Sequence, residues 1–121
     1  ADWRPAQTAE HKIKKDGSGA TPSLSFTENP DILASVAALP QRPYCVGFAA
    51  ESEKLLEHAQ AKRARKGVPL IVANLGPATF GQDDNALLLV DAKGTRELPR
   101  APKTELATQL VAEIAHRLAT P

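Results

Sequence analysis

The chain has 121 residues, with 15 Lys and Arg against 14 Asp and Glu and a formal net charge of +1. This length suits one small domain, and the near-neutral charge leaves no global field to attract nucleic acid or an anionic membrane. A lone cysteine, Cys45, excludes a disulfide within the chain and fits a reducing compartment, so we expect a cytoplasmic protein. The longest apolar runs, such as residues 86–90, are far shorter than the ~20 residues of a membrane span.

A basic cluster, HKIKK at residues 11–15, comes first, and the segment KDGSGATP at residues 15–22 continues from it. The Gly, Ser and Asp of this segment cost conformational entropy to order and offer little to bury, so we expect it to be mobile. Lysines beside a mobile loop suit closure over an anionic ligand, because lysine neutralises phosphate as a compact charge. A solvated basic turn is the alternative interpretation.

Asn29, Pro30 and Asp31 predict the start of a helix, as an N-cap, a proline at the first helical position and an acid in the first turn. We expect this helix to run to about Leu39, just before Pro40. The free backbone N–H groups at such a start offer a site for ligand oxygens. A helix that is simply well capped explains the same residues.

Continuous apolar runs predict strands at residues 44–48 (YCVGF), 70–73 (LIVA) and 86–90 (ALLLV). Their lack of alternation is typical of parallel strands that are buried on both faces of a sheet. Residues 95–98 follow the third run across a DAKG segment, which predicts a hairpin with Gly94 in its turn. Phe48, at the end of the first strand, either offers its ring face to a nucleobase or packs in the core.

Ser52 is the predicted cap of a second helix, which ends at about Lys66 with Gly67 as its C-terminal stop. Lys62 and Lys66 are four residues apart and share one face of this helix. Cations at this position complement the negative end of the helix dipole, which is a sufficient structural reason for them. A clamp on a triphosphate and a nucleic-acid patch are the functional interpretations, and the patch lacks interleaved aromatic residues.

A third helix is predicted to begin near Lys103 and to cover one face of the sheet. Its apolar residues recur at three- and four-residue steps and so share one face: Leu106, Leu110, Val111, Ile114 and Leu118. The fold class is therefore α/β and Rossmann-like, a mostly parallel sheet flanked by helices, with a flexible flap and a C-terminal hairpin and helix. One helix alone is predicted before residue 44, so we expect further strands and helices of the domain upstream of residue 1.

The chain lacks the Gly-rich phosphate loops, the nucleophile-elbow serine and the Cys-x-x-Cys pairs of well-known sites. His11, His58 and His116 have no metal-ligand spacing, and we interpret them as solvent-facing, so the sequence assigns no residue as a metal ligand. Cys45 is interpreted as an inert core thiol rather than a nucleophile. Two lysine clusters, a helix start and a strand end together favour a site for a phosphorylated ligand such as a nucleotide.

Seven segments, taken in order, resemble phosphopantothenoylcysteine synthetase: ADWRP, KIKK, TENPDILASVAAL, RPYCVGFAAESE, AKRARK, LIVAN and FGQDDNALLL. The resemblance covers nearly the whole chain, from its first residue to about the last helix. In most bacteria this ligase is the C-terminal part of a bifunctional coenzyme A enzyme. The resemblance therefore implies that residues 1–121 are the C-terminal part of a single CTP-dependent ligase domain, with a flap at about residues 15–22.

The activity that this resemblance implies joins 4′-phosphopantothenate to L-cysteine with CTP. The substrate carboxylate attacks the α-phosphate, which gives an acyl-cytidylate and pyrophosphate, and the cysteine amine then attacks the acyl carbon and releases CMP. The resemblance also implies Mg²⁺ and lysines as stabilisers of phosphate charge, and a homodimer. FMN belongs to the decarboxylase domain that precedes the ligase in the bifunctional form, and none is expected here.

Residue by residue, the resemblance makes Lys12 the lysine needed for acyl-cytidylate formation, and the flap after it a cover that excludes water from the intermediate. The positions that match nucleotide-contacting residues of the family are Asp2, Lys12, Asn29, Pro30, Asp31, Ile32, Phe48, Lys62 and Lys66. The family's glycine-rich beginning, its asparagine for the acyl intermediate and much of the phosphopantothenate pocket are expected upstream of Ala1. The alternatives are a non-catalytic nucleotide-binding or assembly module, and an RNA-binding patch at residues 62–66.

Overall fold

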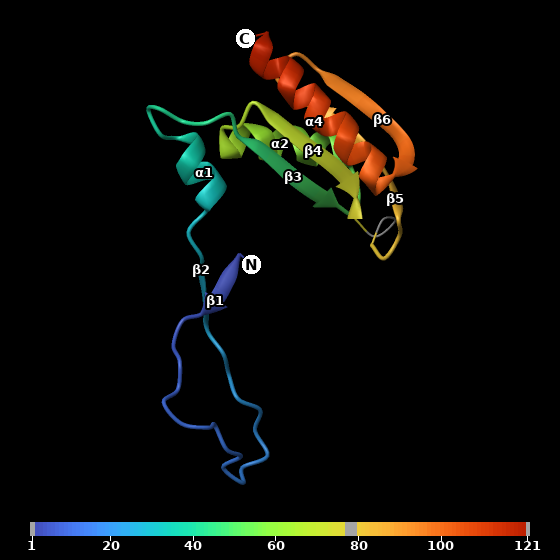
Figure 1. The fold of residues 1–121 in the computed structure, drawn as a ribbon. Coiled ribbons are helices and arrows are strands. Elements are labelled where there is room, and N and C mark those ends of the chain that lie inside the picture. Colours follow the sequence, from blue (N-terminus) through green and yellow to red (C-terminus); the bar gives the residue numbers. More distant parts are fainter. Residues whose placement is uncertain (1, 77–79, 121) are drawn as a thin grey trace. The chain divides into compact units, whose positions relative to one another are not determined.

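The computed structural model describes residues 2–76 and 80–120 of the chain. Ala1 and Pro121, the predicted ends of the ligase part, lie outside the described residues. The chain divides into two compact units, Ala1–Ile32 and Leu33–Pro121. Figure 1 colours them along the sequence, with the first unit in blue and the second running from cyan to red.

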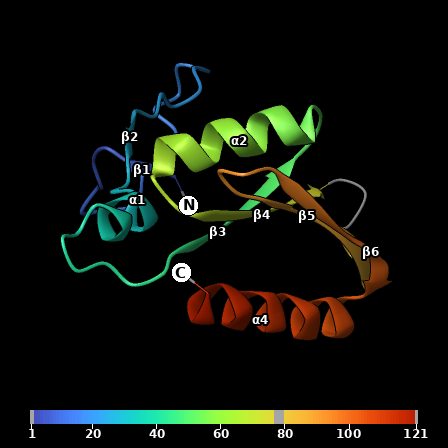
Figure 2. The ribbon, with the colours of Figure 1, turned by 90° about the horizontal axis from the view of Figure 1, so that it is seen from above.

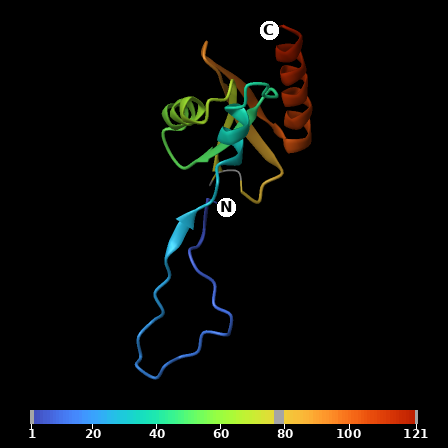
Figure 3. The ribbon, with the colours of Figure 1, turned by 90° about the vertical axis from the view of Figure 1, so that its left-hand side faces the viewer.

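The first unit is a two-stranded ribbon with a long loop. Strand β1 (Trp3–Pro5) pairs antiparallel with β2 (Phe26–Glu28), and Figure 3 shows this ribbon and the loop from the side. Residues 6–25, which include the segment KDGSGATP that is predicted to be mobile, form neither helix nor strand. Every described residue of this unit is exposed or half-buried, so the loop has no hydrophobic core of its own.

Helix α1 (Ile32–Ala37) confirms the first predicted helix but corrects its bounds. Pro30 and Asp31 precede the helix, so the proline is not its first helical residue, and the helix stops before Leu39. Leu33 and Ala37 pack into a hydrophobic cluster on one face of the sheet, and this contact fixes the short helix more than its propensity does.

The second unit contains a four-stranded sheet in the order β3-β4-β5-β6: Val46–Glu51, Leu70–Leu75, Asp84–Val90 and Thr95–Pro102. Strands β3 and β4 are parallel, whereas β4 pairs antiparallel with β5 and β5 with β6. The prediction of a mostly parallel sheet is therefore wrong, although the three apolar runs do lie in strands. The strand expected at residues 44–48 begins at Val46 and continues to Glu51.

Strand β5 shows why a continuous apolar run did not predict the direction of strand pairing. Leu89 packs in the cluster on one face of the sheet, and Val90 packs in the cluster on the other face. A continuous apolar run indicates that a strand is buried on both faces of the sheet. Such burial is compatible with either parallel or antiparallel pairing to the neighbouring strand. The hairpin that follows is as predicted, because the Asp91 Oδ1 accepts hydrogen bonds from the backbone N–H groups of Lys93 and Gly94 at 2.8 and 3.0 Å.

The sheet lies between two helices, α2 (Leu55–Lys66) and α4 (Lys103–Ala119), as Figure 2 shows. On the α4 face, Leu106 and Leu110 pack in a cluster with Leu70, Val72, Leu89 and Leu98. On the α2 face, Ala59 packs in a cluster that includes Ala49, Ile71, Ala73 and Val90. Each fully buried Leu, Ile or Val contributes about 1.5–3 kcal/mol to folding. Among the described helices, none has the length and apolar character needed to cross a membrane.

The apolar stripe predicted on the last helix is only partly buried. Leu106 and Leu110 are 2% and 8% exposed and Ile114 packs beside them, whereas Val111 and Leu118 are 66% and 59% exposed. Neighbouring positions such as 110 and 111 point in directions about 100° apart, so a narrow sheet contact takes one and leaves the other to solvent.

Helix α2 begins later than predicted and ends where predicted. Ser52 does not cap it, because the helix starts at Leu55 after Lys54, whose backbone is left-handed with φ of 46°. Gly67 follows the last helical residue with φ of 69°, and its N–H donates to the carbonyls of Arg63 and Ala64 at 3.0 and 3.3 Å. Glycine adopts this conformation without the strain that a Cβ would bring.

Candidate active site

Two predicted nucleotide-contacting residues that are far apart in the sequence meet at one end of the β1–β2 ribbon. The backbone N–H of Asn29 donates to the carbonyl oxygen of Asp2 at 2.8 Å. Arg4 crosses the same end and donates to the Glu28 carbonyl at 2.9 Å and to the Asn29 Oδ1 at 3.1 Å. The antiparallel register that places Trp3 opposite Glu28 therefore builds one small polar surface from both strands.

Pro30, Asp31 and Ile32 continue the chain from that surface, and all three are exposed. The Ile32 side chain is 75% exposed. The helix that follows has only six residues, so its start carries little of the partial charge that a long helix offers an anion. These residues stay candidates through the family resemblance, whereas the expected helix-terminus site does not gain support from the geometry.

Lys12 lies in the exposed loop between β1 and β2, and Lys14 and Lys15 beside it are exposed too. The neighbouring Asp16 accepts hydrogen bonds from the hydroxyl and the backbone N–H of Ser18, at 2.5 and 2.8 Å. These bonds hold the pKa of the Asp16 carboxyl below its ordinary value. The loop therefore presents a cluster of cations next to one acid that stays ionised.

Phe48 lies on β3 with its side chain 67% exposed, so the alternative in which it packs in the core is wrong. Side chains alternate along a strand, and the buried neighbours Gly47 and Ala49 both face helix α2. The Phe48 ring consequently lies on the opposite face of the sheet, near the middle of β3.

Lys62, on helix α2, lies near the carboxyl end of β3. Its Nζ lies 3.9 Å from the Oε1 of Glu51, the last residue of β3. The other carboxylate oxygen, Oε2, lies 3.5 Å from the Nδ1 of His58. His58 and Lys62 are one turn apart on α2, and Lys66 lies one further turn, about 6 Å along the axis, towards the amino ends of the strands.

Glu51 and His58 are the two residues that sequence reasoning missed. His58 was expected to face solvent, yet its side chain is only 43% exposed and is paired with Glu51. The four-residue spacing of His58, Lys62 and Lys66 was a usable signal, since it places all three along one side of the helix. Glu51 carried a weaker signal as the only charged residue of the strand VGFAAE.

The candidate residues fall into two groups. Asp2, Lys12 and the turn at residues 29–32 belong to the first unit, and Phe48, Lys62 and Lys66 belong to the second. Within the second unit, Phe48 and Lys62 lie on opposite faces of the sheet: Phe48 is near the middle of β3, and Lys62 is near its carboxyl end, where it contacts Glu51. Ligands of open α/β sheets bind beyond the carboxyl ends of parallel strands.

No metal centre is preformed in the part of the chain that the structure describes. Within residues 2–76 and 80–120, no three His, Cys, Asp or Glu side chains gather closely enough to hold a metal ion.

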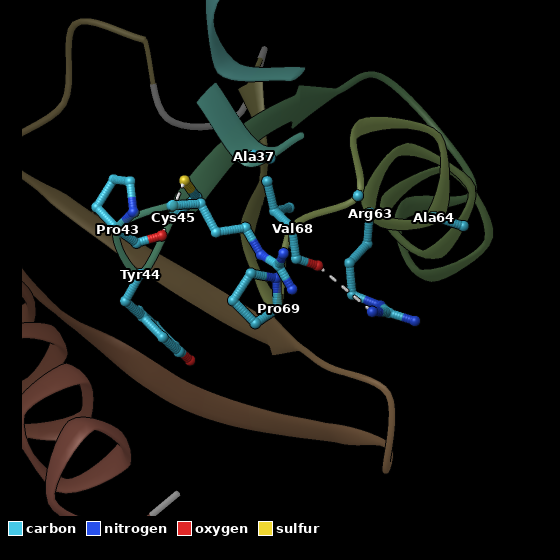
Figure 4. Close-up of a pocket in the computed structure, with 10 residues that line it drawn as sticks. Ala37, Pro43, Tyr44, Cys45, Arg63, Ala64, Val68 and Pro69 are labelled. Carbon is cyan, nitrogen blue, oxygen red and sulfur yellow. Dashed lines mark hydrogen bonds between the residues drawn. The ribbon is translucent and has the colours of Figure 1, made fainter. Parts of the chain in front are cut away.

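A hollow of about 550 Å³ lies at the opposite, amino-terminal ends of β3 and β4 (Figure 4). Cys45 lines it and is 7% exposed, with its Sγ donating to the Pro43 carbonyl at 3.4 Å, so the predicted core thiol is confirmed, just before β3. Arg63 donates to the Val68 carbonyl at 3.4 Å across the same wall. None of the predicted site residues, all of which are described, lines this hollow.

Comparison with known proteins gives a family. Residues 1–118 match the family described as the DNA/pantothenate metabolism flavoprotein C-terminal domain. The chain is 42% identical over 115 residues to the coenzyme A biosynthesis bifunctional protein CoaBC of Vibrio cholerae, a match that covers 92% of this chain and 29% of the relative. It is 44% identical over 122 residues to CoaBC of Escherichia coli, which covers 97% of this chain and 30% of the relative.

Solved structures show the same fold. The crystal structure of the C-terminal domain of CoaBC superposes with a TM-score of 0.74 at 24% identity, covering 100% of this chain and 52% of that one. The DNA/pantothenate metabolism flavoprotein of Streptococcus pneumoniae superposes with a TM-score of 0.71 at 18% identity, covering 97% of this chain and 59% of that one.

The chain therefore belongs to the family of DNA/pantothenate metabolism flavoprotein C-terminal domains. Within the curated relatives this domain is the phosphopantothenoylcysteine synthetase part of CoaBC, and the resemblance found in the sequence is confirmed. The chain spans about 30% of the length of the curated relatives it matches.

Proposed function

We propose that this chain is part of a CTP-dependent ligase that joins 4′-phosphopantothenate to L-cysteine in coenzyme A biosynthesis. The observation that carries the proposal is the family match over residues 1–118. The joining of Asp2 to Asn29 by a backbone hydrogen bond supports it, because two separate motifs of the resemblance then form one surface.

The first step forms the activated acid. A carboxylate oxygen of 4′-phosphopantothenate attacks the α-phosphorus of CTP, the bond from that phosphorus to the bridging oxygen breaks, and pyrophosphate leaves. Negative charge grows on the phosphate oxygens as this happens, and a positioned ammonium group stabilises it. We assign this role to Lys12, and we assign the exposed loop around it the task of covering the acyl-cytidylate against water.

The second step forms the amide. The neutral amine of cysteine attacks the acyl carbon, the bond from that carbon to the phosphate oxygen breaks, CMP leaves, and the amine gives up its proton. No three His, Cys, Asp or Glu side chains of the described residues gather to hold a metal ion, and magnesium at nucleotide sites is held largely through substrate phosphates, so we assign it neither a residue nor a step.

Each unit offers groups that suit a nucleotide, and each is considered by itself. The exposed ring of Phe48 offers a stacking surface for the base, and base–aromatic stacking contributes about 1–3 kcal/mol. Lys62 and Lys66 supply positive charge from α2, and the surface formed by Asp2 and Asn29 supplies polar groups. Half-buried lysines favour phosphate without the planar geometry that arginine demands.

A chimera tests the proposal directly. This chain replaces the matching segment of Escherichia coli CoaBC, and CMP release is measured with CTP, 4′-phosphopantothenate and cysteine, beside the unaltered Escherichia coli protein. We expect release that requires all three substrates. Calorimetric titration of the 121-residue chain with CTP supplies a readout that does not depend on the chimera.

CTP binding by the chain without cysteine-dependent CMP release by the folded chimera would favour the non-catalytic nucleotide-binding module. Neither binding nor turnover would overturn the proposal. Strong, salt-dependent binding of RNA in place of CTP would favour the patch at residues 62–66.

A further inference from the structure

Glu51 is placed at the junction of the sheet and helix α2, where it contacts two side chains of the helix. Its side chain is 21% exposed, and the side chains of Lys62 and His58 are 28% and 43% exposed. One carboxylate oxygen faces Lys62 and the other faces His58, so a single acid spans one full turn of the helix.

The distance between the Glu51 carboxylate and the Lys62 ammonium determines how the acid acts on the lysine. At 3.9 Å, the Glu51 Oε1 attracts the Lys62 ammonium but is too far away for a hydrogen bond. The ammonium therefore keeps its N–H donors for another acceptor while its position is restrained. A carboxylate in direct hydrogen-bond contact would instead compete with a phosphate for those donors.

Restraining a lysine side chain before the ligand binds lowers the entropy cost of binding. A free lysine side chain has four rotatable bonds, and fixing it on a ligand loses rotamer entropy at the moment of binding. A lysine that is already held near its working position loses less. His58 contributes by contacting the second oxygen of the same carboxylate, which orients Glu51 from the other side.

We propose that Glu51, oriented by His58, is a positioning residue that holds Lys62 ready for the phosphates of the nucleotide. This inference rests on the proposed function, since it takes CTP as the ligand. Glu51 acts only through Lys62 and does not itself touch the nucleotide.

The experiment compares Glu51→Gln with Glu57→Gln in the chimera described above. Glu57 is an exposed acid on the same helix, so its variant changes the charge equally and leaves the contact intact. We expect Glu51→Gln to raise the KM for CTP about three- to tenfold, the cost of ordering one long side chain, with kcat changed less than twofold. Glu51→Asp, which keeps the charge on a shorter side chain, should restore part of the loss, and Glu57→Gln should match the parent.

A Lys62→Met background separates positioning from other effects. Once the lysine is gone, Glu51→Gln should raise KM no further, because there is no ammonium left to hold. An unchanged or lowered KM in Glu51→Gln, or an equal rise in the Lys62→Met background, overturns the inference. Turnover with CTP that is indifferent to Glu51 would leave the proposed function standing, whereas a folded parent without any response to CTP would overturn the proposed function itself.

Discussion

The two units of this chain place their candidate residues on different kinds of structure. In the first, residues 2–32, Lys12 lies on an exposed loop that joins the two strands of a short ribbon. The second carries Phe48 and Lys62 on a strand and a helix that pack against a sheet with buried clusters on both faces. A ligand group on a packed framework is held in place before binding, whereas one on an exposed loop is free to move onto the ligand.

This contrast suits the proposed function, in which a nucleotide is bound first and a reactive intermediate is then shielded. In the proposed function, Phe48 and Lys62 of the packed framework are assigned stacking and charge, and Lys12 and its loop are assigned the catalytic ammonium and the exclusion of water. Catalytic residues on loops that are positioned by a rigid scaffold are common for this reason.

Hydrogen exchange tests the contrast with the largest expected effect. Backbone amides at residues 7–24 should exchange within about tenfold of the unprotected rate, whereas those of β4 should be protected by at least about 10³-fold. The measurement is exchange monitored by mass spectrometry or NMR at pH 7. Protection at residues 7–24 that equals that of β4 would contradict the description of the loop as open.

Substitutions on α4 test where the framework of the second unit gets its stability. Leu106→Ala should lower the free energy of unfolding by about 2–5 kcal/mol, because Leu106 is 2% exposed and fills the cluster on the α4 face. Val111→Ala is the matched control on the same helix and should change it by less than about 0.5 kcal/mol, because Val111 is 66% exposed. Urea unfolding measures both, and equal losses would show that the predicted stripe is buried after all.

Asp91 joins the β5–β6 turn to α4 and gives a smaller, pH-dependent effect. Its Oδ2 lies 2.8 Å from the Nη1 of Arg117. Burial alone would raise the pKa of Asp91, but hydrogen bonds from Arg117, Lys93 and Gly94 outweigh it and lower the pKa below the ordinary 3.8. The stability that this contributes is fully present above pH 3.8 and is lost as the pH falls through the lowered pKa.

We expect Asp91→Asn to lower the free energy of unfolding by at most about 1 kcal/mol at pH 7, since the pair is partly exposed and the amide oxygen keeps the turn bonds. Urea midpoints of the variant and the parent should converge when the pH falls well below 3.8. A gap between them that stays constant from pH 7 to pH 2.5 would show that the charge of Asp91 is not the cause.

Local sequence signals predicted the elements of the second unit well. Gly67 ends α2 and Gly94 lies in the hairpin turn, because backbone demands at these positions act within a few residues. The sequence did not predict that β5 runs antiparallel to β4, because burial on both faces is the same for either direction.

The site was predicted less completely, for a related reason. Motif resemblance supplied positions such as Lys12, Phe48 and Lys62, but the Glu51–Lys62 contact joins a strand end to a helix turn and depends on how the two elements pack. Side-chain pairs of that kind have no fixed spacing in sequence. The resemblance also supplied no orientation, and the alternation along β3 now puts Phe48 and Lys62 on opposite faces of the sheet.

The central claim is that the exposed loop carries the catalytic lysine of an acyl-cytidylate-forming ligase. Its most direct test is single-turnover formation of the acyl-cytidylate from CTP and 4′-phosphopantothenate, without cysteine, in the chimera and in its Lys12→Gln variant. Lys93→Gln, which removes a lysine at the β5–β6 turn, is the matched control. We predict a stoichiometric intermediate in the parent and the control, and a rate at least about 10²-fold lower in Lys12→Gln, with CTP binding largely retained. An intermediate that forms at the parent rate in Lys12→Gln would contradict the account.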